Sequence, residues 1–228
     1  MTETRTETPQ LTDGRTLRLT VAEPENVVRG GLVVLHEARG VTDGVRFLVG
    51  SLADEGWLAV APHIYRDVDE VDHEQAGAAI RSLSGESVLA DTDAACLWLA
   101  DRGVSADLIG VMGFDLGGSV ALVVAASRQV GAAVSVNGGG ISTALSDGLP
   151  ALVDIAGELT CPWLGIYGGA DTEISSDEVE KLREAVTRSE IATEVVRFSG
   201  AEHRFDTDPQ TSAEAWHRTL NWFDAHLR

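Results

Sequence analysis

The segment from Val111 to Ala126, VMGFDLGGSVALVVAA, limits the fold of this chain more than any other part of its sequence. Two apolar runs enclose the sequence GFDLGG, in which glycines stand on both sides of Asp115. Glycine allows a tight turn between a buried strand and a buried helix, and such a strand-turn-helix unit exposes its central side chain at the tip. We therefore predict that Asp115 stands on this turn, where a reactive serine or cysteine is the usual residue.

Short apolar segments alternate with helical patterns along most of the chain. Strands are predicted over residues 30–37, 57–65, 107–114, 131–139, 162–169 and 192–200, with an antiparallel strand and a turn at Asp13 and Gly14 over residues 11–25. Helices are predicted over residues 41–56, 87–103, 116–128 and 175–189, and at the C-terminus, where Trp216, Leu220, Phe223 and Leu227 recur at helical spacing. This alternation is typical of an α/β protein with a mostly parallel sheet and helices on both faces.

The composition favours one domain over residues 11–228, preceded by a polar, flexible tail over residues 1–10. The chain has 228 residues, of which 44% are hydrophobic, enough for a substantial core. Its 36 acidic and 17 basic residues give a net charge of -19, and such a surface repels phosphates and anionic lipid headgroups. We therefore expect no nucleic-acid or membrane partner, and a monomer or small homo-oligomer.

The sequence also predicts the compartment of the protein and the state of its thiols. No segment has the basic and then apolar organisation of a signal peptide, and no apolar run is long enough to span a bilayer, which predicts a cytoplasmic protein. Cys96 and Cys161 lie in apolar surroundings without a metal-ligand or redox spacing. They are therefore predicted to be buried structural thiols.

Candidate reactive residues follow the predicted strands at their carboxyl ends, the edge at which α/β proteins collect their active-site groups. In chain order they are His36, Glu37, Ala38, Arg39, His63, Tyr65, Arg66, Asp115, Asp171 and His203. A turn residue, then an acid, then a histidine is the order of the catalytic triad of α/β-hydrolases. The sequence therefore predicts that Asp115, Asp171 and His203 belong to one site.

Five segments carry a more specific resemblance, to the dienelactone hydrolase family of α/β-hydrolases. They are HEARG at residues 36–40, APHIY at 61–65, GFDLGG at 113–118, YGGADTEIS at 167–175 and GAEHRF at 200–205. Family members open small lactones or esters without a cofactor, using a cysteine on the turn that a glutamate holds in reserve and a histidine with its acid partner activates. The resemblance implies these supporting roles for Glu37, His203 and Asp171. It also implies an oxyanion hole formed by the backbone N–H groups of Leu116 and Ala38.

Asp115 departs from the family pattern at the nucleophile itself, and this changes the expected chemistry. A carboxylate that attacks an ester carbonyl forms a high-energy anhydride, whereas attack on a saturated carbon displaces halide or opens an epoxide and leaves an ordinary ester. Water activated by His203, with Asp171 orienting the imidazole, can then cleave that ester. The haloalkane dehalogenases and epoxide hydrolases are similar in carrying an aspartate on this turn. We expect hydrolysis of a small organic substrate: an epoxide, alkyl halide, lactone or ester.

The sequence leaves other functions open. Glu37, Asp115 and Asp171 converging on one imidazole cannot all ionise cheaply, and a protonated carboxyl beside a carboxylate can catalyse a non-hydrolytic elimination, isomerisation or cyclisation. Asp115 can also mark a lost activity that leaves a small-molecule-binding protein, or an engineered replacement of a cysteine. A divalent metal is disfavoured because no helical histidine pair accompanies the carboxylates. No cofactor is expected.

The remaining candidates are polar residues that flank these groups in the sequence. Arg39 and Arg204 can hold a substrate carboxylate or act as counter-charges to nearby acids. His36 and His63 can line the pocket, and His36 can equally cap the end of its strand. Tyr65, at a strand end, is the better placed of the two tyrosines to act as an acid in epoxide opening. We therefore predict all five as substrate-binding candidates, each with a structural alternative.

Overall fold

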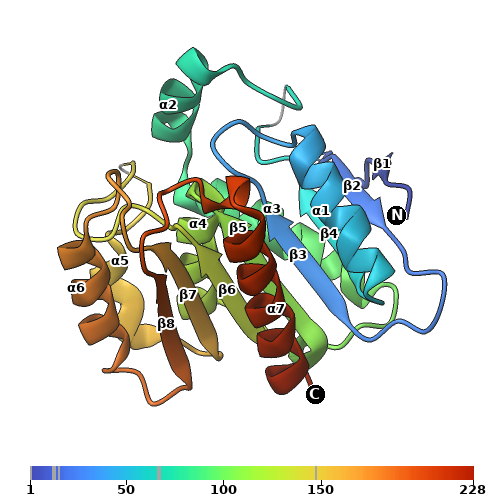
Figure 1. The fold of residues 1–228 in the computed structure, drawn as a ribbon. Helices are drawn as coiled ribbons and strands as arrows, with labels where there is room; N and C mark the ends of the chain where they lie inside the picture. Colours follow the sequence, from blue (N-terminus) through green and yellow to red (C-terminus); the bar gives the residue numbers. More distant parts are fainter. Residues whose placement is uncertain (1, 12–13, 15, 66–67, 147) are drawn as a thin grey trace.

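The computed structural model describes residues 2–11, 14, 16–65, 68–146 and 148–228. Their strands form one eight-stranded sheet in the order β1-β2-β4-β3-β5-β6-β7-β8. These are β1 (Arg5–Glu7), β2 (Leu19–Ala22), β3 (Gly31–Leu35), β4 (Leu58–Pro62), β5 (Ile109–Phe114), β6 (Ala132–Val136), β7 (Trp163–Gly168) and β8 (Thr193–Phe198). The neighbours from β4 across to β8 are parallel, and β1 and β2 are antiparallel. The predicted mostly parallel sheet is confirmed (Figure 1).

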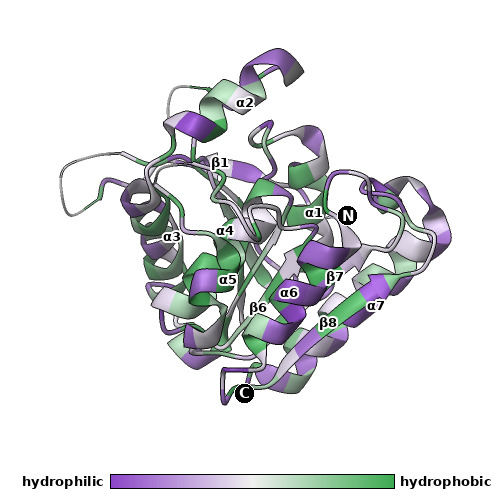
Figure 2. Ribbon diagram, turned by 90° about the vertical axis from the view of Figure 1, so that its left-hand side faces the viewer, coloured by the Kyte–Doolittle hydropathy of each residue, from purple (hydrophilic) through white to green (hydrophobic). Residues whose placement is uncertain are grey.

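Helices cover both faces of this sheet (Figure 1). They are α1 (Asp43–Asp54), α2 (His73–Ser82), α3 (Gly85–Ala100), α4 (Leu116–Ser127), α5 (Leu152–Ile155), α6 (Ser176–Val186) and α7 (Pro209–His226). Apolar side chains of α1 and α7 share one core cluster with the strands, and those of α3 and α4 share another. A third cluster joins α4, α5 and α6. Figure 2 shows that α6 is largely hydrophilic, as expected for a helix on the outside of the molecule.

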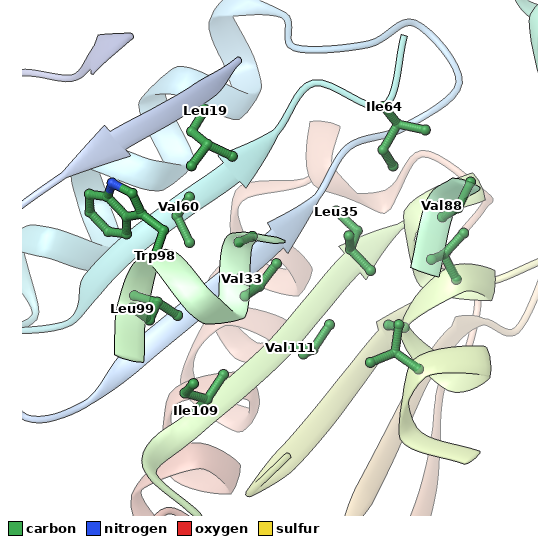
Figure 3. Packing of buried hydrophobic residues seen from close by; sticks show 14 of the residues in the cluster. Leu19, Val33, Leu35, Val60, Ile64, Val88, Trp98, Leu99, Ile109 and Val111 are labelled. Atoms are coloured by element: carbon green, nitrogen blue, oxygen red, sulfur yellow. The ribbon is translucent and has the colours of Figure 1, made fainter. Parts of the chain in front are cut away.

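The central strands are buried on both faces. Val33 and Leu35 of β3 belong to the cluster with α3 and α4, which Figure 3 shows from close by. Leu32 and Val34 of the same strand belong to the cluster with α1 and α7, because successive side chains of a strand point to opposite faces. Such strands therefore appear in the sequence as continuous apolar runs. Since they are parallel, the loops at their carboxyl ends meet at one edge of the sheet.

The N-terminal segment differs from the prediction of a flexible tail over residues 1–10. Arg5–Glu7 forms β1, an edge strand that pairs with β2. The Glu7 carboxylate accepts hydrogen bonds from Trp98 Nε1 at 2.7 Å and from Arg102 Nη2 at 3.0 Å, which fixes this edge against α3 and the residues after it. The prediction is wrong for this strand, because polar edge residues held by backbone pairing and ion pairs leave no hydrophobic periodicity in the sequence.

Neither of the two cysteines forms a disulfide bond. Cys161 is buried, Cys96 is partly buried, and both are free thiols. Asp13 of the predicted turn and the strand-end candidate Arg66 lie outside the described residues. Within the described residues, no helix has both the length and the apolar character needed to cross a membrane.

The turn between β5 and α4 depends on glycines that carry no side chain. A Cβ on Gly113 would lie 2.2 Å from the backbone of Gly117, and a Cβ on Gly117 would lie 2.0 Å from the carbonyl oxygen of Leu35. A Cβ on Gly118 would lie 2.7 Å from the carbonyl oxygen of Val136. The first turn of α4 therefore packs directly against the ends of β3 and β6, where backbone has no room to move aside.

Gly117→Ala is expected to destabilise the protein by about 3 kcal/mol or more, because the added methyl group overlaps backbone atoms of β3. The matched control is Gly44→Ala in the first turn of α1, where a Cβ would meet only Thr42 Oγ1 at 3.5 Å. This control should change stability by less than about 1 kcal/mol. Denaturant unfolding followed by circular dichroism measures both variants, and equal stabilities would contradict the close packing of the turn.

Candidate active site

Asp115 lies on the turn between β5 and α4. Its backbone angles are φ 52° and ψ -116°, a conformation that residues other than glycine rarely adopt. Its N–H donates a 2.9 Å hydrogen bond to the carbonyl oxygen of Val136. This bond and the close packing of the first turn of α4 hold the strained conformation in place. The turn thereby presents the Asp115 side chain at the edge of the sheet, where it lines a cavity.

The backbone N–H groups of Leu116 and Ala38, the two residues predicted to form an oxyanion hole, act on the Asp115 carboxyl and favour its ionised form. Burial raises the pKa of Asp115 above its ordinary value, and the negative charge of Glu173 acts in the same direction. The charge of His203 and the two backbone amides oppose this rise without cancelling it. Asp115 is therefore a desolvated carboxyl with a raised pKa, beside two backbone amides that favour its ionised form.

The loops after β7 and β8 bring Asp171 and His203 together. His203 Nδ1 lies 2.7 Å from Asp171 Oδ2, and the Asp171 side chain is only 1% exposed. Asp171 Oδ1 accepts hydrogen bonds from the N–H groups of Glu173 at 2.7 Å and Ile174 at 2.9 Å. Because an ionised carboxylate only accepts hydrogen bonds, Nδ1 of the imidazole carries the proton. His203 Nε2 is left for a partner in the cavity.

Asn137, which was not among the predicted site residues, connects three loops of the site. Its Nδ2 donates to the carbonyl oxygen of His203 at 2.5 Å, and its Oδ1 accepts from the N–H of Gly168 at 3.3 Å. Asn137 is buried and has φ 48°. Asparagine tolerates such a backbone conformation better than most residues. The sequence signal for it was the Asn-Gly pair, Asn137 and Gly138, directly after an apolar strand.

A cavity of about 190 Å³ opens beside Asp115 and His203. It is lined by Asp115, Gly139, Gly140, Ile141, Leu145, Glu173, Ile174, Glu178 and His203. Glu173 Oε2 lies 4.0 Å from His203 Nε2, so Glu173 is a second carboxylate beside the imidazole. Glu173 and Glu178 were not among the predicted site residues, although Glu173 follows Asp171 by two positions. Among the described residues, no group of three or more histidine, cysteine or acidic side chains is placed to hold a metal ion.

The side chains of His36 and Tyr65, two predicted substrate contacts, form hydrogen bonds with backbone groups. His36 is 1% exposed; its Nε2 accepts the N–H of Ile64 at 3.1 Å, and its Nδ1 donates to the carbonyl oxygen of Glu37 at 2.8 Å. Burial lowers the pKa of His36 to about 4. The Tyr65 hydroxyl donates to the carbonyl oxygen of Ala38 at 2.8 Å, and burial raises its pKa to about 12. Both side chains therefore fix the loop that carries the Ala38 amide.

His63 belongs to a polar cluster between β2 and the loop after β4. Its Nε2 lies 2.9 Å from Thr20 Oγ1, and its Nδ1 lies 3.0 Å from Asp69 Oδ1. Burial lowers the pKa of His63 to about 4. His63 is 1% exposed and is not part of the cavity lining. The structure therefore places His63 between this loop and β2, and its contact with substrate stays a prediction.

The two predicted arginines are paired with acids. Arg39 forms an ion pair with Glu70. Arg204 makes two parallel hydrogen bonds with Asp206, both 2.9 Å long, and its side chain is 65% exposed. The hydrogen bond to Asp206 raises the pKa of the Arg204 guanidinium, and the negative charges of Glu37 and Asp115 act in the same direction. Both arginines are thus paired with acids, and their contact with substrate stays a prediction.

Residues 17–227 match the model of the Dienelactone hydrolase family. The chain belongs to this family. A Yersinia pestis relative with the name "Putative carboxymethylenebutenolidase" is 31% identical over 209 residues, which cover 86% of this chain and 78% of the relative. A Bradyrhizobium relative with the name "Probable 2-oxo-3-(5-oxofuran-2-ylidene)propanoate lactonase" is 27% identical over 230 residues, which cover 95% and 92%.

A crystal structure from Klebsiella pneumoniae, described as a "Putative Dienelactone Hydrolase", superposes on this chain with a TM-score of 0.85. The two sequences are 30% identical, and the match covers 97% of this chain and 98% of the other. The predicted α/β-hydrolase fold is thereby confirmed. Membership of the family does not by itself determine the reaction of the aspartate on the turn, which depends on the geometry of the site.

Asp115→Asn is expected to stabilise the protein at neutral pH. The folded-state pKa of Asp115 lies above its ordinary value of 3.8, so folding takes up a proton and the wild-type protein loses stability as pH rises between these two values. The amide has the same shape and does not suffer this loss. The stability difference between variant and wild type should therefore grow from acidic to neutral pH, measured by urea unfolding at a series of pH values.

Asp206→Asn supplies a control of opposite sign. The hydrogen bond from Arg204 lowers the pKa of Asp206, so its carboxylate adds stability above the unfolded-state pKa and loses it as pH falls. This variant should be less stable than wild type at neutral pH and equal to it in acid. The burial argument for Asp115 fails if Asp115→Asn follows the same course as Asp206→Asn.

Proposed function

We propose that this protein hydrolyses a small organic molecule at an electrophilic saturated carbon, such as that of an epoxide or alkyl halide, with Asp115 as the nucleophile. The observation that carries the proposal is the position of the Asp115 carboxyl. It stands on the turn between β5 and α4, where the amides of Leu116 and Ala38 favour its ionised form, and it lines the same cavity as His203. A group placed there meets both the substrate and the base that serves the second step.

In the first step, a carboxylate oxygen of Asp115 forms a bond to the substrate carbon. The bond from that carbon to the leaving group breaks, and the leaving group takes the electron pair. Halide leaves as the anion, whereas the alkoxide formed from an epoxide takes a proton from water. The product of this step is an alkyl ester of Asp115. Tyr65 is not assigned as the acid, because its hydroxyl is already donated to the carbonyl oxygen of Ala38.

In the second step, water attacks the carbonyl carbon of that ester. His203 Nε2 takes the proton from water, while Asp171 orients the ring and stabilises the imidazolium that forms. The N–H groups of Leu116 and Ala38 then stabilise the oxyanion of the tetrahedral intermediate. When the intermediate collapses, the alcohol leaves with the proton from His203, and Asp115 is regenerated as a carboxylic acid that releases its proton to solvent.

A non-hydrolytic acid-base reaction is the second candidate, and one observation favours it. Burial raises the pKa of Asp115, which brings the carboxyl closer to the range in which it exchanges protons near neutral pH. In that case Asp115 and His203 act as base and acid on bound substrate, and no covalent ester forms. The two candidates are distinguished by whether substrate becomes attached to Asp115.

His203→Ala should accumulate the ester on Asp115, because alkylation needs only the carboxylate whereas hydrolysis needs the base. The variant is incubated with small epoxides, alkyl halides, lactones and activated esters, and its intact mass is measured. A mass increase that peptide digestion places on Asp115 is the expected result for an epoxide or halide. The matched control, His203→Ala combined with Asp115→Asn, should gain no mass under the same conditions. An equal increase in this control would contradict the assignment of the nucleophile.

Isotope labelling then separates the two proposed reactions. In a single turnover in water labelled with heavy oxygen, the attack of water on the ester places the label in the Asp115 carboxylate and leaves the first product unlabelled. Direct attack of water on substrate would label the product in that first turnover. Product formed over many turnovers without any solvent oxygen would show a non-hydrolytic reaction and overturn the proposed hydrolysis.

A further inference from the structure

The charged side chains that line the cavity beside His203 are all acidic. They are Asp115 on the turn before α4, Glu173 in the loop after β7, and Glu178 in the first turn of α6. Glu173 is the most accessible to a ligand, because its side chain is 71% exposed while its Oε2 lies 4.0 Å from His203 Nε2. Glu173 is therefore an exposed carboxylate that lines the same cavity as Asp115 and His203.

The two arginines predicted near the site have carboxylate partners of their own outside the cavity lining. Arg204 is the cation nearest in chain to His203, and its guanidinium makes two 2.9 Å hydrogen bonds with Asp206. Arg39 forms its ion pair with Glu70. Neither arginine is part of the cavity lining. The charge of Arg204 acts on Asp115 from outside this lining. A substrate carboxylate beside Glu173 would therefore meet acidic lining side chains with no arginine among them, and like charges at short range repel.

This charge pattern contrasts with the substrate in the name of one relative. The Bradyrhizobium protein, 27% identical, has a name that describes a lactonase of a propanoate, which is a carboxylate-bearing substrate. A site for such a substrate requires donors or cations that hold the anionic end. In this chain the net charge of -19 adds a long-range field of the same sign as the cavity acids.

We propose that the cavity prefers substrates carrying a positively charged ammonium group, and that Glu173 is the residue that determines this preference. The proposal rests on the proposed function only for the choice of this cavity as the substrate site. The turn around Asp171 fixes the backbone of Glu173, because the Glu173 N–H donates to Asp171 Oδ1 at 2.7 Å. The same turn therefore orients the imidazole and fixes the backbone from which the selecting carboxylate projects.

The test compares three probes of nearly equal shape: choline, 3,3-dimethylbutan-1-ol as its neutral isostere, and 3,3-dimethylbutanoate as the anion. Binding is followed by NMR through the ring protons of His203, which are assigned by their loss in His203→Gln. Each titration is carried out on the full chain with total ionic strength held constant by sodium chloride. Choline should bind at least about threefold more tightly than the neutral alcohol, and the carboxylate more weakly than the alcohol.

Glu173→Gln should reduce the preference for choline over the alcohol by about threefold or more while leaving the affinity for the alcohol unchanged. The matched control is Glu190→Gln, which removes one exposed acid between α6 and β8, at the other end of the strands from the cavity. This control should keep the preference, which separates a local effect of Glu173 from the effect of net charge.

Three results would overturn the proposal: no saturable shift of the His203 protons with choline, equal affinity for choline and the carboxylate, or a preference that Glu173→Gln leaves intact. Because the experiment measures binding without turnover, its result is independent of whether an ester forms on Asp115. A cation preference without ester formation would support the charge selection and reject the nucleophile. Ester formation without a cation preference would do the reverse.

Discussion

The contact between the first turn of α4 and the ends of β3 and β6 determines most of the site. Gly117 has no Cβ, so the helix begins directly against the carbonyl oxygen of Leu35. The helix N-terminus, whose amides are free and whose dipole favours negative charge, is thereby placed beside the loop that follows Leu35. For this reason the Leu116 amide of the helix and the Ala38 amide of the loop act on the same carboxyl.

A second group of interactions, made by buried side chains, fixes the loop of Ala38 and the position of His203. His36 and Tyr65 were expected to contact substrate, but the structure uses them to hold the backbone of residues 37 and 38. On the other side, Asn137 holds the backbone of His203, while Asp171 holds its ring. Each reacting group is thus fixed by buried partners that do not themselves line the cavity, which is what precise placement of a catalytic group requires.

The parts of this structure that the sequence predicted are those with a regular signal. Apolar runs marked the parallel strands, and the glycines around Asp115 marked the turn. Strand β1 has no such signal, because Glu7 is held by Trp98 and an arginine far away in the chain. Glu173 was missed for a related reason: its sequence surroundings are those of an ordinary polar loop, and only the turn around Asp171 brings it near His203. The residue types in the sequence predicted Asp115, Asp171 and His203. Only the distances in the structure show that Glu173 lies beside His203.

A carboxylate at position 115 constrains how the whole cavity can be charged. A carboxylate in this buried place is costly to ionise, and the neighbouring Glu173 adds to that cost. Yet only the ionised form can attack carbon. A cationic substrate bound beside Glu173 would offset both negative charges and lower the pKa of Asp115 when it binds. Substrate binding would then itself generate the nucleophile, so the acidic lining that disfavours ionisation in the empty site becomes the means of coupling ionisation to the correct ligand.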